Sequence, residues 1–192
     1  MTRQAAFLAV LAALGGCVGI DAGARFYSYF ASALFTAGTL GYVQAQGPVP
    51  VAVHGTPFPT AAQDVFARSV AATMSGANAG PPLRFTVDPP GPREADYRAV
   101  VVFGTAWVGA EDLCRVRAPE IAPTTAARIH AEAAFCVADR KVTEIKGDMF
   151  AAATGPDDPA FHAFVRGLIF NLLPPRSRND SRRQPCNPMM GC

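Results

Sequence analysis

The chain has 192 residues, of which 50% are hydrophobic and 17% charged, which is the composition of an ordinary globular protein. The formal net charge at pH 7 is only +2, too small to indicate a nucleic-acid partner. A chain of this length accommodates one packed core with tails, so a single folded domain is expected.

The chain begins with a stretch laid out like a secretory signal. Arg3 supplies a positive start, residues 4–14 form an uncharged and largely apolar run, and Leu14-Gly15-Gly16-Cys17 ends it. These four residues resemble the lipobox of bacterial lipoproteins. The resemblance implies signal cleavage between Gly16 and Cys17, a diacylglyceryl thioether on Cys17, and acylation of its new amino group, for example by palmitate.

A lipobox assigns the rest of the chain to the bacterial envelope. Residues 1–16 are then the signal peptide, and the protein faces the periplasm on a lipid anchor. Val18 is not acidic, which resembles lipoproteins sorted to the outer membrane rather than the inner one. The alternative is an uncleaved signal anchor over residues 4–20, which is short for a membrane span of about 20 residues.

Residues 17–39 are expected to form a lipidated, membrane-proximal segment that is unusually aromatic. Its aromatic side chains are Phe26, Tyr27, Tyr29, Phe30 and Phe35. Because so apolar a stretch rarely stays exposed to water, we expect it to pack onto the domain as a helix or strand. The alternative is a contact surface for a partner or an interfacial helix, with Tyr27, Tyr29 and Phe30 at headgroup depth. A membrane span over residues 26–43 is less favoured, because Gly, Ser and Thr dilute the apolar run.

A single domain is expected over residues 40–174. Residues 40–46 and 49–53 resemble short strands, and Pro48 and Pro50 favour a sheet edge, because proline cannot donate to a ladder. A helix is expected from Thr60, which makes a capping-box pattern with Gln63, to the glycine at position 76. Residues 83–87 alternate as in a strand. The apolar run within residues 97–103 predicts the central strand.

The second half of the domain predicts a hairpin and a closing helix. Residues 128–137 alternate between apolar and polar side chains, and Asp139-Arg140 turns the chain into a returning strand over residues 141–145. Asp158 and Pro159 form a helix start, and an apolar stripe follows to Leu172. The element order predicts an α+β two-layer sandwich, with two helices on one face of a mainly antiparallel sheet.

That element order loosely resembles the TolB-amino-terminal and CsgG-like α+β domains of envelope lipoproteins, over about two-thirds of the chain. A Val-rich strand that runs into Gly55-Thr56-Pro57-Phe58 also resembles small envelope lipoproteins of unknown function from alphaproteobacteria. Neither resemblance supplies catalytic residues. Both imply a binding or assembly role with an envelope protein partner.

With Cys17 lipidated, the remaining cysteines are four and allow three pairings. Cys114 and Cys136 both belong to the domain, which favours a disulfide between them worth ~3 kcal/mol. Cys186 and Cys192 are left for a small loop in the tail, residues 175–192, whose basic composition does not fold alone. The tail is expected to be a solvated extension or to contact an anionic surface.

No motif for catalysis, nucleotide binding or metal binding stands out, and no cofactor is expected. His130 and Glu132 share a strand face and are a candidate acid/base pair, although a solvated antiparallel face ordinarily carries such residues. Trp107, in the loop 104–123, is a candidate ligand platform. We therefore expect a binding, scaffolding or complex-accessory protein without catalysis. The alternative is a periplasmic hydrolase or small-ligand-binding domain that uses the loop 104–123.

Overall fold

The computed structural model describes residues 23–36, 38–88, 97–106, 113–115 and 118–175. The elements in chain order are β1 (Ala24–Ala31), α1 (Thr39–Ala45), β2 (Val49–His54), α2 (Gln63–Met74), β3 (Phe85–Thr86), β4 (Tyr97–Phe103), β5 (Thr105–Ala106), β6 (Ile121–Ala122), β7 (Ile129–Val137), β8 (Arg140–Met149) and α4 (Pro159–Leu172). Within the described ranges, every helix is too short or too polar to cross a bilayer.

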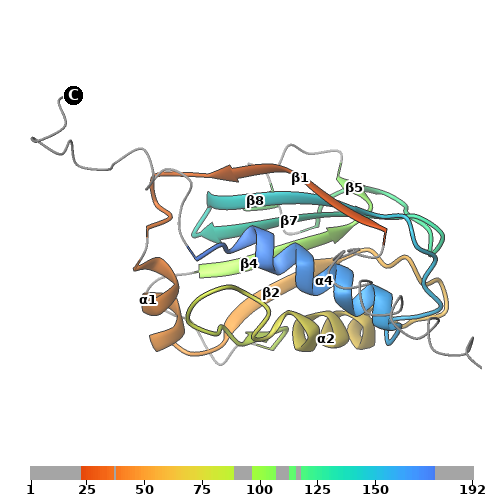
Figure 1. Cartoon of the computed structure of the whole chain (residues 1–192), viewed down its shortest axis with the longest axis horizontal. Helices are drawn as coiled ribbons and strands as arrows, with labels where there is room; N and C mark the ends of the chain where they lie inside the picture. Colours follow the sequence, from red (N-terminus) through yellow and green to blue (C-terminus); the bar gives the residue numbers. More distant parts are fainter. Residues whose placement is uncertain (1–22, 37, 89–96, 107–112, 116–117, 176–192) are drawn as a thin grey trace, which may run out of the picture.

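One six-stranded sheet organises the fold, in the order β1-β8-β7-β4-β2-β3 (Figure 1). Antiparallel ladders join β1, β8, β7 and β4, whereas β2 runs parallel to both β4 and β3. β5 and β6 form a small antiparallel pair of their own. This open mixed sheet with its helices confirms the α+β class predicted from the sequence.

Aromatic side chains join α2 and α4 to the centre of the sheet. Phe66 of α2 and Phe161 of α4 both contact Phe103 of β4, with ring centroids 5.0 and 5.6 Å from that of Phe103. Phe58 contacts the rings of Phe66 and Phe161 at 6.0 and 5.2 Å. Burial of these large rings supplies much of the apolar area that stabilises the main core.

β4 is a central strand, as its apolar run predicted, and it lies between β7 and β2. Val101 and Phe103 belong to the main core, whereas Val100 and Val102 belong to a smaller core on the other face, with Leu113, Cys114, Ala134 and Cys136. A strand covered on both faces needs apolar side chains at every position, because the side chains that point to either face are removed from water.

The hairpin and the last helix also follow their sequence signals. β7 and β8 pair along their length, and Ala138 in the turn between them has a φ of +48°. Asp158 caps α4, since its Oδ1 accepts a hydrogen bond from the amide of Ala160 at 2.9 Å, and Pro159 occupies the first turn. The predicted helix start is therefore confirmed.

The strand expected over residues 40–46 is wrong, because most of these residues form α1. Leu40 and Val43 are the apolar side chains that α1 buries. Their spacing of three positions brings them to one face of a helix, whereas in a strand it would send them to opposite faces.

The capping box expected at Thr60 is also wrong. α2 begins at Gln63 with Ala62 as its N-cap, and no side chain caps it. The side-chain Nε2 of Gln63 instead donates to the carbonyl of Val53 at 2.9 Å. This contact ties the start of α2 to β2.

The edge position expected for β2 is wrong, because β2 lies between β4 and β3 in the sheet. The ladder with β4 begins only at Val51, and β3 pairs with Val49 and Pro50 alone. Pro50 thus stands before the long ladder, where a missing N–H removes little pairing. β3 itself is only 2 residues long, shorter than the strand expected over residues 83–87.

The described part of the aromatic segment packs onto the domain, and Ala24–Ala31 within it form β1, an edge strand of the described sheet. The alternative of an interfacial helix is therefore wrong over Ala24–Ala31, and the sheet begins before the boundary expected at residue 40. Tyr27 pairs with Lys146 and Phe30 with Glu144, so β1 holds one extra residue here. This bulge includes Ser28, whose φ is +55°.

Candidate functional site

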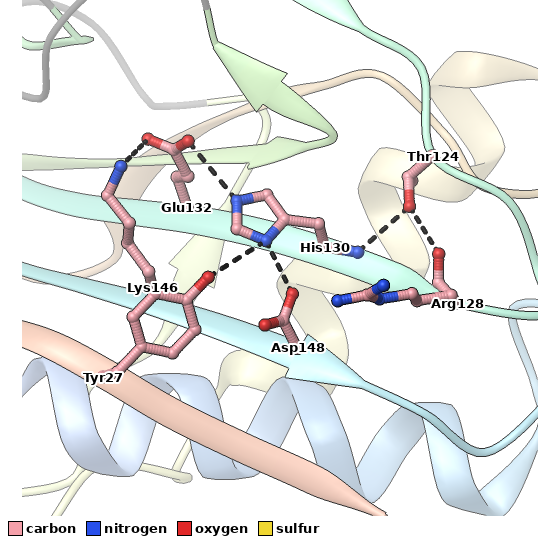
Figure 2. Close-up of polar contacts among 7 residues, drawn as sticks. All are labelled: Tyr27, Thr124, Arg128, His130, Glu132, Lys146 and Asp148. Carbon is pink, nitrogen blue, oxygen red and sulfur yellow. Dashed lines mark hydrogen bonds and ion pairs between the residues drawn. The ribbon is translucent and has the colours of Figure 1, made fainter.

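Polar side chains of β1, β7 and β8 gather on the face of the sheet opposite the main core. The alternating apolar residues of β7 belong to that core, so His130 and Glu132 point the other way. The register sets His130 beside Asp148 and Glu132 beside Lys146, and Tyr27 of β1 is also beside Lys146. Figure 2 shows these five side chains, which we call the His130 cluster.

His130 has a carboxylate at each ring nitrogen. Nδ1 lies 2.8 Å from Oδ1 of Asp148 and 3.4 Å from the hydroxyl of Tyr27, and Nε2 lies 3.4 Å from Oε1 of Glu132. Hydrogen bonding to Glu132 and then to Asp148 raises the pKa of His130, although burial opposes the shift. The geometry favours an imidazolium that donates to both carboxylates.

Glu132 is a nearly buried carboxylate, with 2% of its side chain exposed. Lys146 Nζ lies 3.1 Å from its Oε2, while Oε1 faces His130. Burial alone would raise the pKa of Glu132, but hydrogen bonds from His130 and Lys146 outweigh burial and lower it. Two cations thus keep a buried anion ionised.

A threonine fixes the start of β7 beside the cluster. The amide of His130 donates to Thr124 Oγ1 at 3.0 Å, and the Thr124 hydroxyl donates to the carbonyl of Arg128 at 2.7 Å (Figure 2). Because Thr124 accepts and donates at once, it holds the chain before β7 in one arrangement. The imidazole is consequently set where both carboxylates reach it.

The four charged side chains of the His130 cluster balance one another. Protonated His130 and Lys146 carry two positive charges, and Glu132 and Asp148 carry two negative ones. Both ring nitrogens of His130 and both carboxylate oxygens of Glu132 already have partners within the cluster. Proton transfer to a substrate would first have to break one of these contacts, so the arrangement suits the joining of three strands better than acid/base catalysis.

The structure brings the sequence-predicted pair His130 and Glu132 together, but the solvated face expected around them is wrong at Glu132. Sequence reasoning missed Tyr27, Lys146 and Asp148 as members of the cluster. Their positions depend on register between strands, for which no local motif exists.

A second ion pair lies on the same face. Lys141 Nζ is 2.8 Å from Oε2 of Glu144, and the two side chains are 12% and 9% exposed. The Lys141 ammonium lies 4.4 Å from the ring centroid of Phe30 in β1. Phe30 itself remains 40% exposed. β1 therefore contacts the His130 cluster through Tyr27 and the Lys141–Glu144 ion pair through Phe30.

An apolar groove runs between β1 and α4. An open cavity of about 660 Å³ is lined mainly by small and apolar side chains, together with the polar side chains of Arg166 and Asn171. The other lining residues are Ala24, Phe26, Ala77, Ala160, Ala163, Phe164, Gly167 and Phe170. A neighbouring cavity of about 200 Å³ shares Phe26, Phe170 and Asn171 with it. We call the two cavities together the β1–α4 groove.

Phe26 lines both cavities of that groove and joins β1 to α4. Its ring stacks on Phe164, with centroids 5.7 Å apart and planes 13° from parallel. Glycines leave the room for this ring. A Cβ at Gly147 or Gly167 would lie 2.9 or 2.7 Å from the nearest Phe26 ring atom.

The other predicted contact residues differ in their exposure. Phe35 is only 3% exposed and belongs to the main core, so it offers no surface to a partner or membrane and that expectation is wrong. Tyr29 is partly buried against the same core. Gly16, Cys17 and Trp107 lie outside the described residues, so lipidation, cleavage and a ligand platform stay predictions.

Cys114 and Cys136 form the disulfide favoured by the sequence, with Cα atoms 5.7 Å apart and a sequence separation of 22. Both cysteines are buried in the smaller core. The guanidinium of Arg98 donates to the carbonyl of Cys114. The bond and this contact fasten residues 113–115 to the sheet.

Neither a protein-family model nor a curated protein matches the sequence. A solved structure of a dodecameric PelC variant from Paraburkholderia phytofirmans shares 13% sequence identity over 81% of this chain and 98% of that chain, with a TM-score of 0.36. A likeness at this level carries no argument about what the chain does.

Proposed function

We propose that the protein is a lipid-anchored envelope protein that faces the periplasm and binds or scaffolds another envelope protein, without catalysing a reaction. The spacing between the lipobox and the sheet carries the proposal. Cys17 lies seven positions before Ala24, the first residue of β1. A lipid on Cys17 would therefore lead directly into an edge strand rather than through a long linker.

The disulfide supports the export part of the proposal. Cys114 and Cys136 are bonded within the domain, and structural disulfides persist in oxidising compartments such as the periplasm. The absence of an acidic residue after Cys17 is the reason for proposing the outer membrane.

The surfaces around β1 support the binding part of the proposal. The larger cavity of the β1–α4 groove is open, lined mainly by apolar side chains and next to an edge strand, and Phe170 in its lining is 53% exposed. A partner segment could bury this apolar surface beside the strand. The His130 cluster, in contrast, is closed by its own ion pairs.

Substitution of the anchor cysteine tests the lipid. We expect the wild-type chain to incorporate labelled palmitate and to fractionate with the outer membrane, whereas Cys17→Ser should do neither and should appear in the soluble periplasm. Cys192→Ser is the matched control, because it removes a tail cysteine and leaves the lipobox intact. Equal palmitate labelling of wild type and Cys17→Ser would contradict the proposed lipid anchor on Cys17.

Crosslinking tests the partner. The lipidated protein, crosslinked in intact cells and purified, should capture an envelope protein that Phe170→Asp fails to capture. Tyr42→Asp is the control, since Tyr42 is equally exposed at 53% but lies on α1. Identical capture by all three chains would remove the groove as the binding surface.

A further inference from the structure

An exposed aromatic ring lies where the chain enters the sheet. Phe150 directly follows β8, and it is 51% exposed. Its amide donates to the carbonyl of Gly23 with an N to O distance of 2.6 Å, and Gly23 immediately precedes β1. Phe150 is thus fixed by its backbone beside the start of β1. We call this region, Gly23 with Phe150, the tether end of the sheet.

The tether end cannot lie far from the lipid on Cys17. Six residue steps separate Cys17 from Gly23, and an extended chain spans at most ~3.3–3.6 Å per step, or about 20 Å in all. The headgroup layer on one side of a bilayer is itself about 5–8 Å thick. β1 begins at this end and leads to α1 at the opposite end of the molecule (Figure 1). A lipid on Cys17 would therefore hold one defined end of the sheet toward the membrane.

A guanidinium accompanies the exposed ring. Arg128, immediately before β7, lies with its Cζ 5.4 Å from the ring centroid of Phe150. Arg128 is exposed, and so is Arg25 at the second position of β1. Aromatic rings favour the depth of the headgroups, and an arginine near an anionic leaflet is attracted to its phosphates. Phe150 and Arg128 together therefore have the chemistry of side chains at a lipid interface.

We propose that Phe150 and Arg128 form a lipid-contact site, in which the ring enters the boundary between headgroups and acyl chains and the guanidinium meets the phosphates. The inference rests on lipidation of Cys17, and it adds an orientation that the anchor alone does not specify. The apolar ring provides an attraction that salt does not screen, whereas the guanidinium of this site contributes a single charge. The contact should therefore be only weakly sensitive to salt.

Fluorescence quenching tests the contact. The lipidated full chain is reconstituted into vesicles of phosphatidylethanolamine and phosphatidylglycerol whose acyl chains are brominated, because bromine quenches tryptophan only at close range. Phe150→Trp is compared with Tyr42→Trp, and the signal of Trp107 is subtracted with the wild-type chain. Tyr42 matches Phe150 in exposure, at 53% against 51%, but lies on α1.

We expect Phe150→Trp to lose fluorescence in brominated vesicles and Tyr42→Trp to keep it, with little change at high salt. Arg128→Gln in the Phe150→Trp background should reduce the loss. If the chain floats with the vesicles but the two tryptophans are quenched equally, the lipid-contact site is wrong and the anchor stands. If the wild-type chain carries no lipid and does not float, the anchor fails and the site fails with it.

Discussion

Lys146 reaches a carboxylate that water hardly touches: its Nζ lies 3.1 Å from Oε2 of Glu132, whose side chain is 2% exposed. The Lys146 side chain is itself 30% exposed, so it links the interior of the polar face to solvent. Together with His130, Lys146 is what allows a charged group to remain in the sheet.

Lys146→Met should lower the free energy of unfolding by about 1–3 kcal/mol, because Glu132 would keep only His130 as a cationic partner. Urea denaturation followed by circular dichroism measures the change. Arg68→Met is the control, since it breaks the exposed pair with Asp64 on α2 and should barely move the midpoint. Equal shifts in the two variants would contradict a special role for Glu132.

His130→Gln should destabilise the protein more at about pH 5.5 than at about pH 8.5. The pKa of His130 is raised above 6.5, so its contribution is complete below 6.5 and is lost as pH rises through the folded-state pKa. The pKa of Glu132 is lowered below 4.5, so its contribution holds above 4.5 and is lost as pH falls through the folded-state pKa. Both contributions to stability are present between about pH 4.5 and 6.5. Urea titrations of wild type and variant at each pH measure the free energy of unfolding.

His54→Gln provides the contrasting control. Burial lowers the pKa of His54, so protonation of His54 at low pH opposes folding, and its replacement should be better tolerated at about pH 5.5 than at about pH 8.5. The same pH trend for both variants would contradict the ion-paired state of His130.

Gly167→Ala should destabilise the protein by about 1–3 kcal/mol, although alanine favours helices by nearly 1 kcal/mol over glycine. The new Cβ would lie 2.7 Å from the ring of Phe26, which is already confined by Gly147 and Phe164. Thermal unfolding compares it with Gly155→Ala, where a Cβ meets nothing within 4 Å. A stabilised Gly167→Ala would show that Phe26 does not hold β1 against α4.

Loss of the disulfide in Cys114→Ala with Cys136→Ala should lower stability by about 3 kcal/mol, from the loop of 22 residues that it closes. In the wild-type protein, thiol counting after denaturation without reductant should find at most the two tail cysteines. Detection of four free thiols would contradict the bond.

Local patterns in the sequence predicted the elements whose burial or capping depends on residues adjacent in the sequence. The apolar run of β4 reflects a strand covered on both faces, and the Asp158 and Pro159 start of α4 satisfies backbone groups next to it in sequence. The helix α1 was not predicted because its two buried apolar residues, Leu40 and Val43, are too few to distinguish a helical period from that of a strand.

The His130 cluster could not be predicted for a different reason. A bulge between Phe135 and Cys136 shifts the register of the hairpin, since Cys136 pairs with Lys141 but Phe135 pairs with Thr143. Without that extra residue His130 would face Gly147 instead of Asp148. A one-residue shift changes the neighbour of every side chain beyond it, and nothing in the local sequence marks where it occurs.

The bulge in β1 has a further consequence if the proposed lipid anchor concentrates the protein on a membrane surface. Molecules anchored in one leaflet meet edge to edge far more often than molecules in solution, and a regular edge strand is a template on which a neighbour can add its own strand. The left-handed Ser28 interrupts the regular spacing of backbone groups along β1. On a lipid-anchored protein, this irregular edge would discourage sheet-to-sheet polymerisation in the crowded plane of the membrane.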